Sequence, residues 1–131
     1  MIHAHDWLTY AAGIAAKKVS GKPLVIHVQA TEFDRSGENV NQLVYDLERQ
    51  GMLAADRVIT VSNLTRNIVI NRYGLDPATV VTVHNAVDFK SYKDMAVEKC
   101  VKERVGPFLG RITNQKVPDY FNDVYYKVCN A

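Results

Sequence analysis

The sequence predicts an α/β protein built on a parallel sheet with flanking helices, and two observations carry this fold class. Short β-branched runs alternate along the chain with longer segments of helical character. Glycine, proline and asparagine clusters separate the two kinds of segment, as expected at the ends of helices and strands. This alternation predicts helices on both faces of the sheet.

The first half of this pattern starts with a strand that ends at His5 and a turn at Asp6 and Trp7. An alanine-rich helix is predicted over 8–19, and the sequence Ser-Gly-Lys-Pro at 20–23 ends it. Residues 24–28 form a β-branched run that predicts a buried strand.

The second half repeats the alternation after a polar loop predicted at 31–37. A helix is predicted over 38–55, with Val40, Leu43, Val44 and Leu47 on one face. Further segments are predicted as a strand at 57–61, a helix at 63–72 capped by Ser62, and a strand at 80–83.

The C-terminal third repeats the start of such a domain. A charged stretch at 90–104 is interpreted as a linker or short helix. Phe108 and Leu109 then predict a strand, residues 110–116 a loop, and 118–128 a helix. Arg111 and Lys116 in that loop suit a diphosphate, because a guanidinium pairs phosphate oxygens bidentately and a helix N-terminus adds N–H donors. An opening of this kind suggests a piece of a larger protein.

Composition excludes several classes of protein. The 131 residues are 47% hydrophobic and carry a net charge of +2 from 16 basic and 14 acidic residues. This balance, without a basic block interleaved with aromatics, argues against a nucleic-acid partner. No apolar run reaches the roughly 18 residues of a membrane span. Cys100 and Cys129 lack metal or disulfide spacing, which favours a reducing, cytoplasmic location.

Ligands of parallel sheets bind at the carboxyl ends of the strands, and the polar clusters of this chain follow those ends. These motifs resemble the family 4 retaining glycosyltransferases, in particular their glycogen and starch synthase-like members. The stretches that carry the resemblance are HAHDWLT at 3–9, ATEFDRSGE at 30–38, ADRVITVS at 55–62, VHNAVD at 83–88 and FLGRITNQK at 108–116.

The resemblance implies a GT-B fold of two Rossmann-like domains facing a cleft. Residues 1–89 would be part of the acceptor-side N-terminal domain, with an incomplete Rossmann-like sheet. Residues 90–104 would be the linker, and 105–131 the first strand, loop and helix of the nucleotide-sugar-binding domain. The implied reaction transfers a hexose from a nucleoside-diphosphate sugar to a carbohydrate or other hydroxyl acceptor with retention.

The resemblance also implies site residues. His5 matches the family histidine beside the transferred sugar, and Asn85 matches the asparagine near the site. Arg111 and Lys116 match the pair that holds the donor diphosphate, and would do the work of a cation, so neither a metal nor a cofactor is expected. His5 could instead bond a nearby carbonyl, and Asn85 could be a turn residue.

A second group of polar residues is expected to support the acceptor side. Glu32, Asp34 and Arg35 form either a polar network around the acceptor or a self-satisfied, salt-bridged loop. Asp6 is expected to support the turn and cap the following helix, and Ser62 to serve mainly as a cap. The group as a whole comprises Asp6, Thr31, Glu32, Asp34, Arg35 and Ser62.

The chain departs from the family pattern in several places. Gln29 stands where relatives commonly carry a second histidine, and Ala86 replaces a frequent glycine. Val117 replaces the glycine after the lysine, where a β-branched residue does not readily adopt a positive φ. Gly106-Pro107 interrupts a predicted buried strand.

Two other interpretations compete with an active transferase. The first is metal-dependent hydrolysis, because His3, His5 and Asp6 resemble the start of a metal cluster, although the next histidine, His27, is distant in sequence. The second is a truncated or degenerate relative without catalysis, an interaction module or gene remnant. The isolated chain is expected to be nearly inactive. The sugar, nucleotide, acceptor and oligomeric state stay open.

Overall fold

The computed structural model describes residues 1–88, 107–110 and 117–129. The chain divides into two compact units, Met1–Asn85 and Ala86–Ala131, each of which is described by itself. Among the described residues, no helix has the length and apolar character needed to cross a bilayer.

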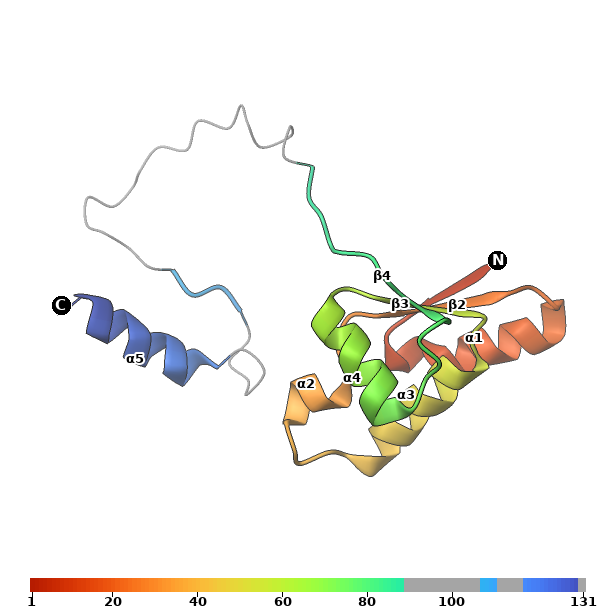
Figure 1. Ribbon diagram of the computed structural model, residues 1–131, viewed down its shortest axis with the longest axis horizontal. Helices are drawn as coiled ribbons and strands as arrows, with labels where there is room; N and C mark the ends of the chain where they lie inside the picture. Colours follow the sequence, from red (N-terminus) through yellow and green to blue (C-terminus); the bar gives the residue numbers. More distant parts are fainter. Residues whose placement is uncertain (89–106, 111–116, 130–131) are drawn as a thin grey trace. The chain divides into compact units, whose positions relative to one another are not determined.

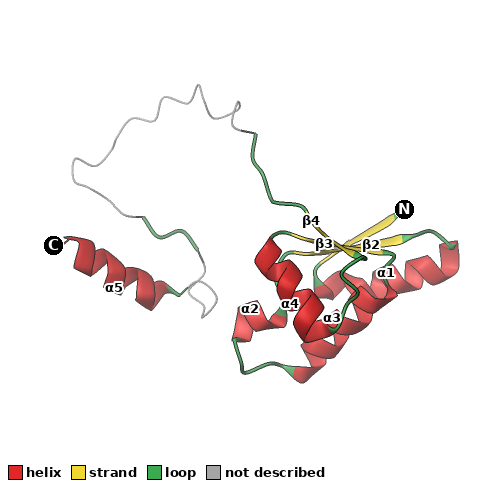
Figure 2. Ribbon diagram, in the orientation of Figure 1, coloured by secondary structure: helices red, strands yellow, loops and turns green. Residues whose placement is uncertain are grey.

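The first unit is built on a parallel four-stranded sheet (Figure 2). The strands lie side by side in the order in which they occur in the chain, β1-β2-β3-β4. Their bounds are β1 Ile2–His5, β2 Leu24–Val28, β3 Arg57–Thr60 and β4 Val80–Thr82. The predicted α/β fold class is thereby confirmed, and the four predicted strands of this unit are present within one or two residues of their expected bounds.

Four helices connect these strands, and local signals fix their ends. They are α1 Trp7–Ser20, α2 Glu32–Ser36, α3 Gln42–Ala54 and α4 Asn63–Tyr73. Gly21 and Gly74 end α1 and α4 with φ of 64° and 74°, left-handed values that glycine adopts without steric cost. Ser62 caps α4 as predicted, because its hydroxyl accepts a hydrogen bond from the N–H of Thr65.

All four helices lie on one side of the sheet, whereas the sequence had predicted helices on both faces (Figure 1). The reason is topological. Parallel crossovers are right-handed, so strands added in one direction place every connecting helix on the same face. Within the first unit, no helix lies on the opposite face of the sheet, which is called the open face below.

The hydrophobic core lies between the sheet and these helices. Leu24, Ile26 and Val28 alternate along β2 toward the helices and are at most 2% exposed. Gly51 lets α3 pack closely against α1, because a Cβ atom there would lie 2.4 Å from the ring of Tyr10 in α1. These contacts fix the helices against the sheet and leave the alternate strand residues on the open face.

The segment between β2 and β3 differs from its prediction. The expected polar loop at 31–37 contains α2, and α3 starts at Gln42 instead of near residue 38. Asn41 begins α3 because its side chain accepts hydrogen bonds from the N–H groups of Leu43 and Val44. The predicted apolar face was also wrong: Leu43 is 69% exposed, whereas Glu48, Gly51 and Met52 are buried.

In the second unit the predicted helix is confirmed as α5, Pro118–Cys129. Residues 107–110 form no strand, in contrast to the prediction for Phe108 and Leu109, because strand geometry needs a hydrogen-bonded neighbour. The predicted domain boundaries, with a linker at 90–104 between segments 1–89 and 105–131, stay a prediction.

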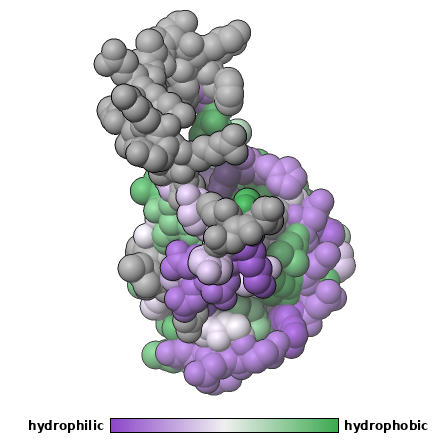
Figure 3. Space-filling view, turned by 90° about the vertical axis from the view of Figure 1, so that its left-hand side faces the viewer, coloured by the Kyte–Doolittle hydropathy of each residue, from purple (hydrophilic) through white to green (hydrophobic). Residues whose placement is uncertain are grey.

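Most of the coloured surface in Figure 3 is hydrophilic, and smaller hydrophobic patches lie between the hydrophilic areas.

Candidate functional site

Polar side chains from three strands meet at the carboxyl-terminal edge of the sheet. Asn85, which follows β4, donates from Nδ2 to Oε1 of Gln29, which follows β2, at 3.2 Å. Nε2 of Gln29 lies 3.5 Å from Nε2 of His27. His27 in turn faces His5 at the end of β1, with ring centroids 4.8 Å apart. Residues 80 positions apart in sequence therefore join one polar chain.

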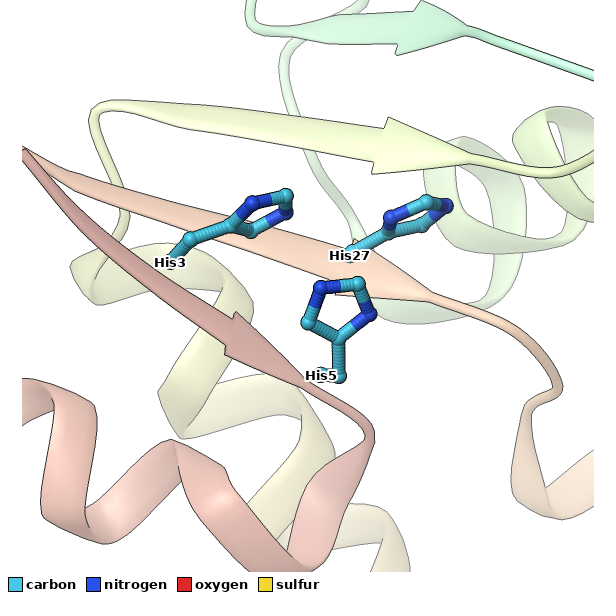
Figure 4. A group of neighbouring side chains, drawn as sticks. All are labelled: His3, His5 and His27. Carbon is cyan, nitrogen blue, oxygen red and sulfur yellow. The ribbon is translucent and has the colours of Figure 1, made fainter.

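Three histidines share the open face of β1 and β2 (Figure 4). His3 and His5 are two residues apart on β1, so their side chains point to the same face. His27 is paired directly with His5 in the parallel register of β1 and β2. The ring centroid of His3 lies 4.4 Å from that of His5 and 5.7 Å from that of His27.

The environment of His27 favours its neutral form. Partial burial lowers the pKa of His27 below its ordinary value, and the nearby His5 and His3 lower it further. Asp6 acts in the opposite direction but does not outweigh these effects. A neutral imidazole keeps one nitrogen lone pair, so His27 can accept a hydrogen bond or ligate a cation.

Asp6 holds the turn between β1 and α1 with unusual backbone geometry. Its φ of 58° and ψ of 161° lie in a region that is nearly restricted to glycine. The predicted cap on α1 is wrong, because the Asp6 side chain makes no capping bond and instead accepts from the N–H of Gln29 at 3.2 Å. Asp6 therefore ties the ends of β1 and β2 together, which agrees with its predicted support of the turn.

The predicted supporting residues after β2 form a second, buried network. Arg35 binds two carboxylates, Glu32 through Nε at 3.2 Å and Glu48 through Nη2. Glu48 also accepts hydrogen bonds from the hydroxyl of Tyr73 and from the N–H of Glu32. This network joins α2, α3 and α4, and it matches the self-satisfied alternative predicted for these residues.

Several members of this network are buried, although Arg35 is only half-buried. Thr31 is 0% exposed, Glu32 6% and Glu48 2%. Burial lowers the pKa of Arg35, but the charge of Glu48 and hydrogen bonds to Glu48 and Glu32 more than compensate, so the pKa is raised overall. Asp34 accepts from the N–H of Thr31 at 2.6 Å and its hydroxyl at 2.9 Å, which stabilises the start of α2.

Sequence reasoning missed two members of these networks. Glu48 was missed because the buried face of its helix was predicted from the apolar residues alone. A buried glutamate is recognisable only when the positions of its partners Arg35 and Tyr73 are known. His27 was set aside because it is distant from His3 and His5 in sequence. A polar residue near the end of a β-branched run was the available signal, although only the register of β1 against β2 places it beside His5.

The donor-loop residues are not placed by the structure. Arg111 and Lys116 lie outside the described residues. So does Gly106 of the Gly106-Pro107 pair, which was expected to interrupt a strand. Val117 is described, and its φ of 47° is left-handed, so this valine occupies a backbone conformation suited to glycine. Val117 therefore carries backbone strain at the point where α5 begins.

Comparison with known proteins assigns the chain to a family of enzymes that transfer sugars. Residues 1–91 match Glycosyltransferase Family 4, and the chain belongs to that family. The chain is 30% identical to D-inositol 3-phosphate glycosyltransferase 2 of Catenulispora acidiphila over 91% of its own length and 31% of that protein. It is 32% identical to alpha-maltose-1-phosphate synthase of Mycolicibacterium smegmatis over 88% of its own length and 34% of that protein. The chain thus spans about a third of the length of these relatives.

Proposed function

We propose that this chain is part of a retaining, glycogen synthase-like glycosyltransferase that moves a hexose from a nucleoside-diphosphate sugar to an acceptor hydroxyl. One observation carries the proposal: His5 and Asn85 are linked through His27 and Gln29 at the carboxyl-terminal edge of a parallel sheet. This edge is where such sheets bind ligands. Membership of Glycosyltransferase Family 4 supplies the class of reaction.

His5 is proposed to contact the transferred sugar. Its imidazole is exposed, and no described residue is hydrogen-bonded to its ring nitrogens, so the ring is available to a ligand. An imidazole in this position can hydrogen-bond a sugar hydroxyl and stabilise the charge that develops as the glycosidic bond breaks. Asn85 is proposed to position the sugar or acceptor with its amide.

The donor diphosphate is proposed to bind Arg111 and Lys116. Two cations would neutralise the departing nucleoside diphosphate, so the transfer itself would need neither a metal ion nor an organic cofactor. Charge neutralisation of this kind lowers the barrier because the leaving group gains negative charge in the transition state. A cytoplasmic location fits a nucleotide-sugar substrate and completes this proposal.

A second candidate function is an interaction module or remnant without catalysis. It is favoured by a specific observation, the left-handed φ of 47° at Val117 beside the proposed diphosphate loop. A Cβ branch there would crowd a phosphate that approaches the backbone. A Val117→Gly variant distinguishes the two candidates: donor binding by both the unaltered chain and the variant supports the transferase, whereas binding that appears only in the variant supports the module.

The transferase proposal is tested with a chimera. Residues 1–91 replace the matching segment of the Catenulispora acidiphila relative, and release of nucleoside diphosphate is measured over a panel of nucleotide sugars. We expect turnover, and we expect His5→Ala to lower kcat roughly 100-fold or more, as for removal of a group that stabilises transition-state charge. The isolated 131-residue chain is expected to show little or no transfer.

The matched control is Asn67→Ala, an exposed substitution on α4 that leaves the edge site intact. Circular dichroism establishes that each chimera is folded before the kinetic comparison. A folded chimera without turnover, or equal activity of the His5→Ala and control variants, would contradict the proposal. A chimera that does not fold is replaced by nuclear magnetic resonance detection of UDP, ADP or GDP binding to the 131-residue chain, and loss of binding in Lys116→Met is the expected result.

A further inference from the structure

Three of the four histidines in the chain lie within one small area of the open face. They are His3, His5 and His27, and one nitrogen from each ring lies within 4.8 Å of the other two. His3 and His5 are exposed, His27 is half-buried, and no described residue hydrogen-bonds the ring nitrogens of His3 or His5. Nitrogen lone pairs of these neighbouring imidazoles can therefore bind the same ligand.

We propose that these three histidines bind a transition-metal cation of the imidazole-preferring kind, with Zn²⁺ as the leading candidate. Zinc takes imidazole nitrogens at about 2.0–2.1 Å in tetrahedral geometry, and three protein ligands leave a fourth position open. Tetrahedral ligand atoms at that distance are roughly 3.4 Å apart. The side chains therefore need to move together by about 1 Å, and exposed imidazoles on an uncovered face can rotate by that amount.

Strands β1 and β2 hold the backbone of the three histidines in fixed positions. Residues at positions i and i+2 of β1 present both imidazoles on one face, and the parallel register sets His27 directly opposite His5. Neighbouring strands are about 4.8 Å apart, a spacing that one cation can bridge through side chains. The backbone positions of all three ligands are thus fixed by ladder hydrogen bonds before any cation binds.

A neighbouring carboxylate favours a cation at this place. Asp6 adds this carboxylate at the same end of β1, and its Oδ1 accepts a hydrogen bond from the N–H of Gln29 at 3.2 Å. The side-chain nitrogen of Gln29 is a donor and lies 3.5 Å from Nε2 of His27, so the lone pair of this ring leaves that contact when it binds the cation.

The proposal is tested by titrating Zn²⁺ into the metal-free 131-residue chain and measuring heat and stoichiometry. Cys100→Ser and Cys129→Ser are introduced first, because thiolates also bind zinc. We expect one ion per chain, and we expect Co²⁺ at the same site to give the visible absorption of a tetrahedral complex. His27→Ala should lower the affinity by more than the roughly 100-fold associated with loss of a group that only orients a metal ligand.

His84→Ala is the matched control, because His84 is the remaining histidine and its ring contacts the carbonyl of Val61 at 3.1 Å, outside the cluster. It should leave zinc binding unchanged. Equal binding by the His3→Ala, His5→Ala, His27→Ala triple variant, or no stoichiometric binding at all, would overturn the proposal. Zinc bound here would occupy the His5 ring that is proposed to contact the sugar, so zinc binding and sugar transfer exclude each other at this ring. Because the readout is metal binding by the isolated chain, this result is independent of whether the chimera transfers sugar.

Discussion

The two faces of the sheet differ in what they contribute, although the same strands build both. On the face covered by α1, α3 and α4, β2 presents Leu24, Ile26 and Val28, all nearly inaccessible to solvent. On the open face the alternate positions present Val25 and His27, and β1 adds its two exposed histidines. Stability is therefore concentrated on one face, and side chains able to bind a ligand are concentrated on the other.

Polar groups on the two faces are also treated differently. Behind the covered face, Glu48 is 2% exposed but has Arg35, Tyr73 and the N–H of Glu32 as partners. Among the described residues, no buried side-chain nitrogen or oxygen lacks a hydrogen bond. On the open face, no described residue hydrogen-bonds the imidazoles of His3 and His5. Buried polar groups must be satisfied by the fold, whereas exposed ones can wait for a ligand.

The largest effect is expected from Glu48→Ala. The substitution removes one of the two carboxylates that bind Arg35 and leaves the hydroxyl of Tyr73 without its partner, and breaking a buried ion pair in this way costs about 3–5 kcal/mol. Urea denaturation at neutral pH measures the loss in the free energy of unfolding. Glu48→Gln keeps hydrogen-bonding capacity and should lose less.

Asp46→Ala is the control for this prediction, because Asp46 lies on the same helix but is exposed. It should change the free energy of unfolding by no more than about 0.5 kcal/mol. If Glu48→Ala were as stable as Asp46→Ala, the network joining α2, α3 and α4 would not contribute to folding, and the contrast between the faces would lose its polar component.

A pair of isoleucine substitutions compares the faces directly. Ile26 on β2 is 0% exposed and faces the helices, whereas Ile59 on β3 is half-buried on the open face. Ile26→Ala should cost at least about 2 kcal/mol through lost burial and a residual cavity, and Ile59→Ala less than about 1 kcal/mol. Equal losses in the same denaturation experiment would show that both faces stabilise the sheet.

Local sequence signals predicted much of this fold. Gly21 and Gly74 marked helix ends, and Ser62 marked a helix start, because capping depends on residues close in sequence. The strand at 24–28 was predicted at its observed bounds because its β-branched run is short and uninterrupted. Polar residues after the strands also predicted which edge of the sheet would carry the linked polar side chains from His5 to Asn85.

Features that depend on distant partners could not be read in this way. The burial of Glu48 depends on Arg35 and Tyr73, which belong to other helices, so the apolar pattern of α3 predicted the wrong face. The histidine cluster depends on the register of β1 against β2, which no local pattern specifies. Helix placement on one face followed from strand order, a property of the whole sheet.

The smallest expected effect concerns protonation on the open face. Burial lowers the pKa of His27, and the charges of His5 and His3 lower it further, so His27 should titrate below its ordinary value of 6.5 in the metal-free chain. The ring-proton chemical shifts followed by nuclear magnetic resonance against pH measure this value. The double variant His3→Ala, His5→Ala should raise the pKa without fully restoring it, because burial persists.

The sign of the stability change follows from this direction. A pKa lower in the folded than in the unfolded chain means that the unfolded chain binds more protons, so stability falls as the pH drops below about 6.5 and levels off below the folded-state pKa. The double variant should lose less stability over the same interval, because the repulsion has been removed. A His27 pKa at or above 6.5 would mean that the open face is solvated well enough to screen its imidazoles from one another, and the difference between the two faces would then be one of packing alone.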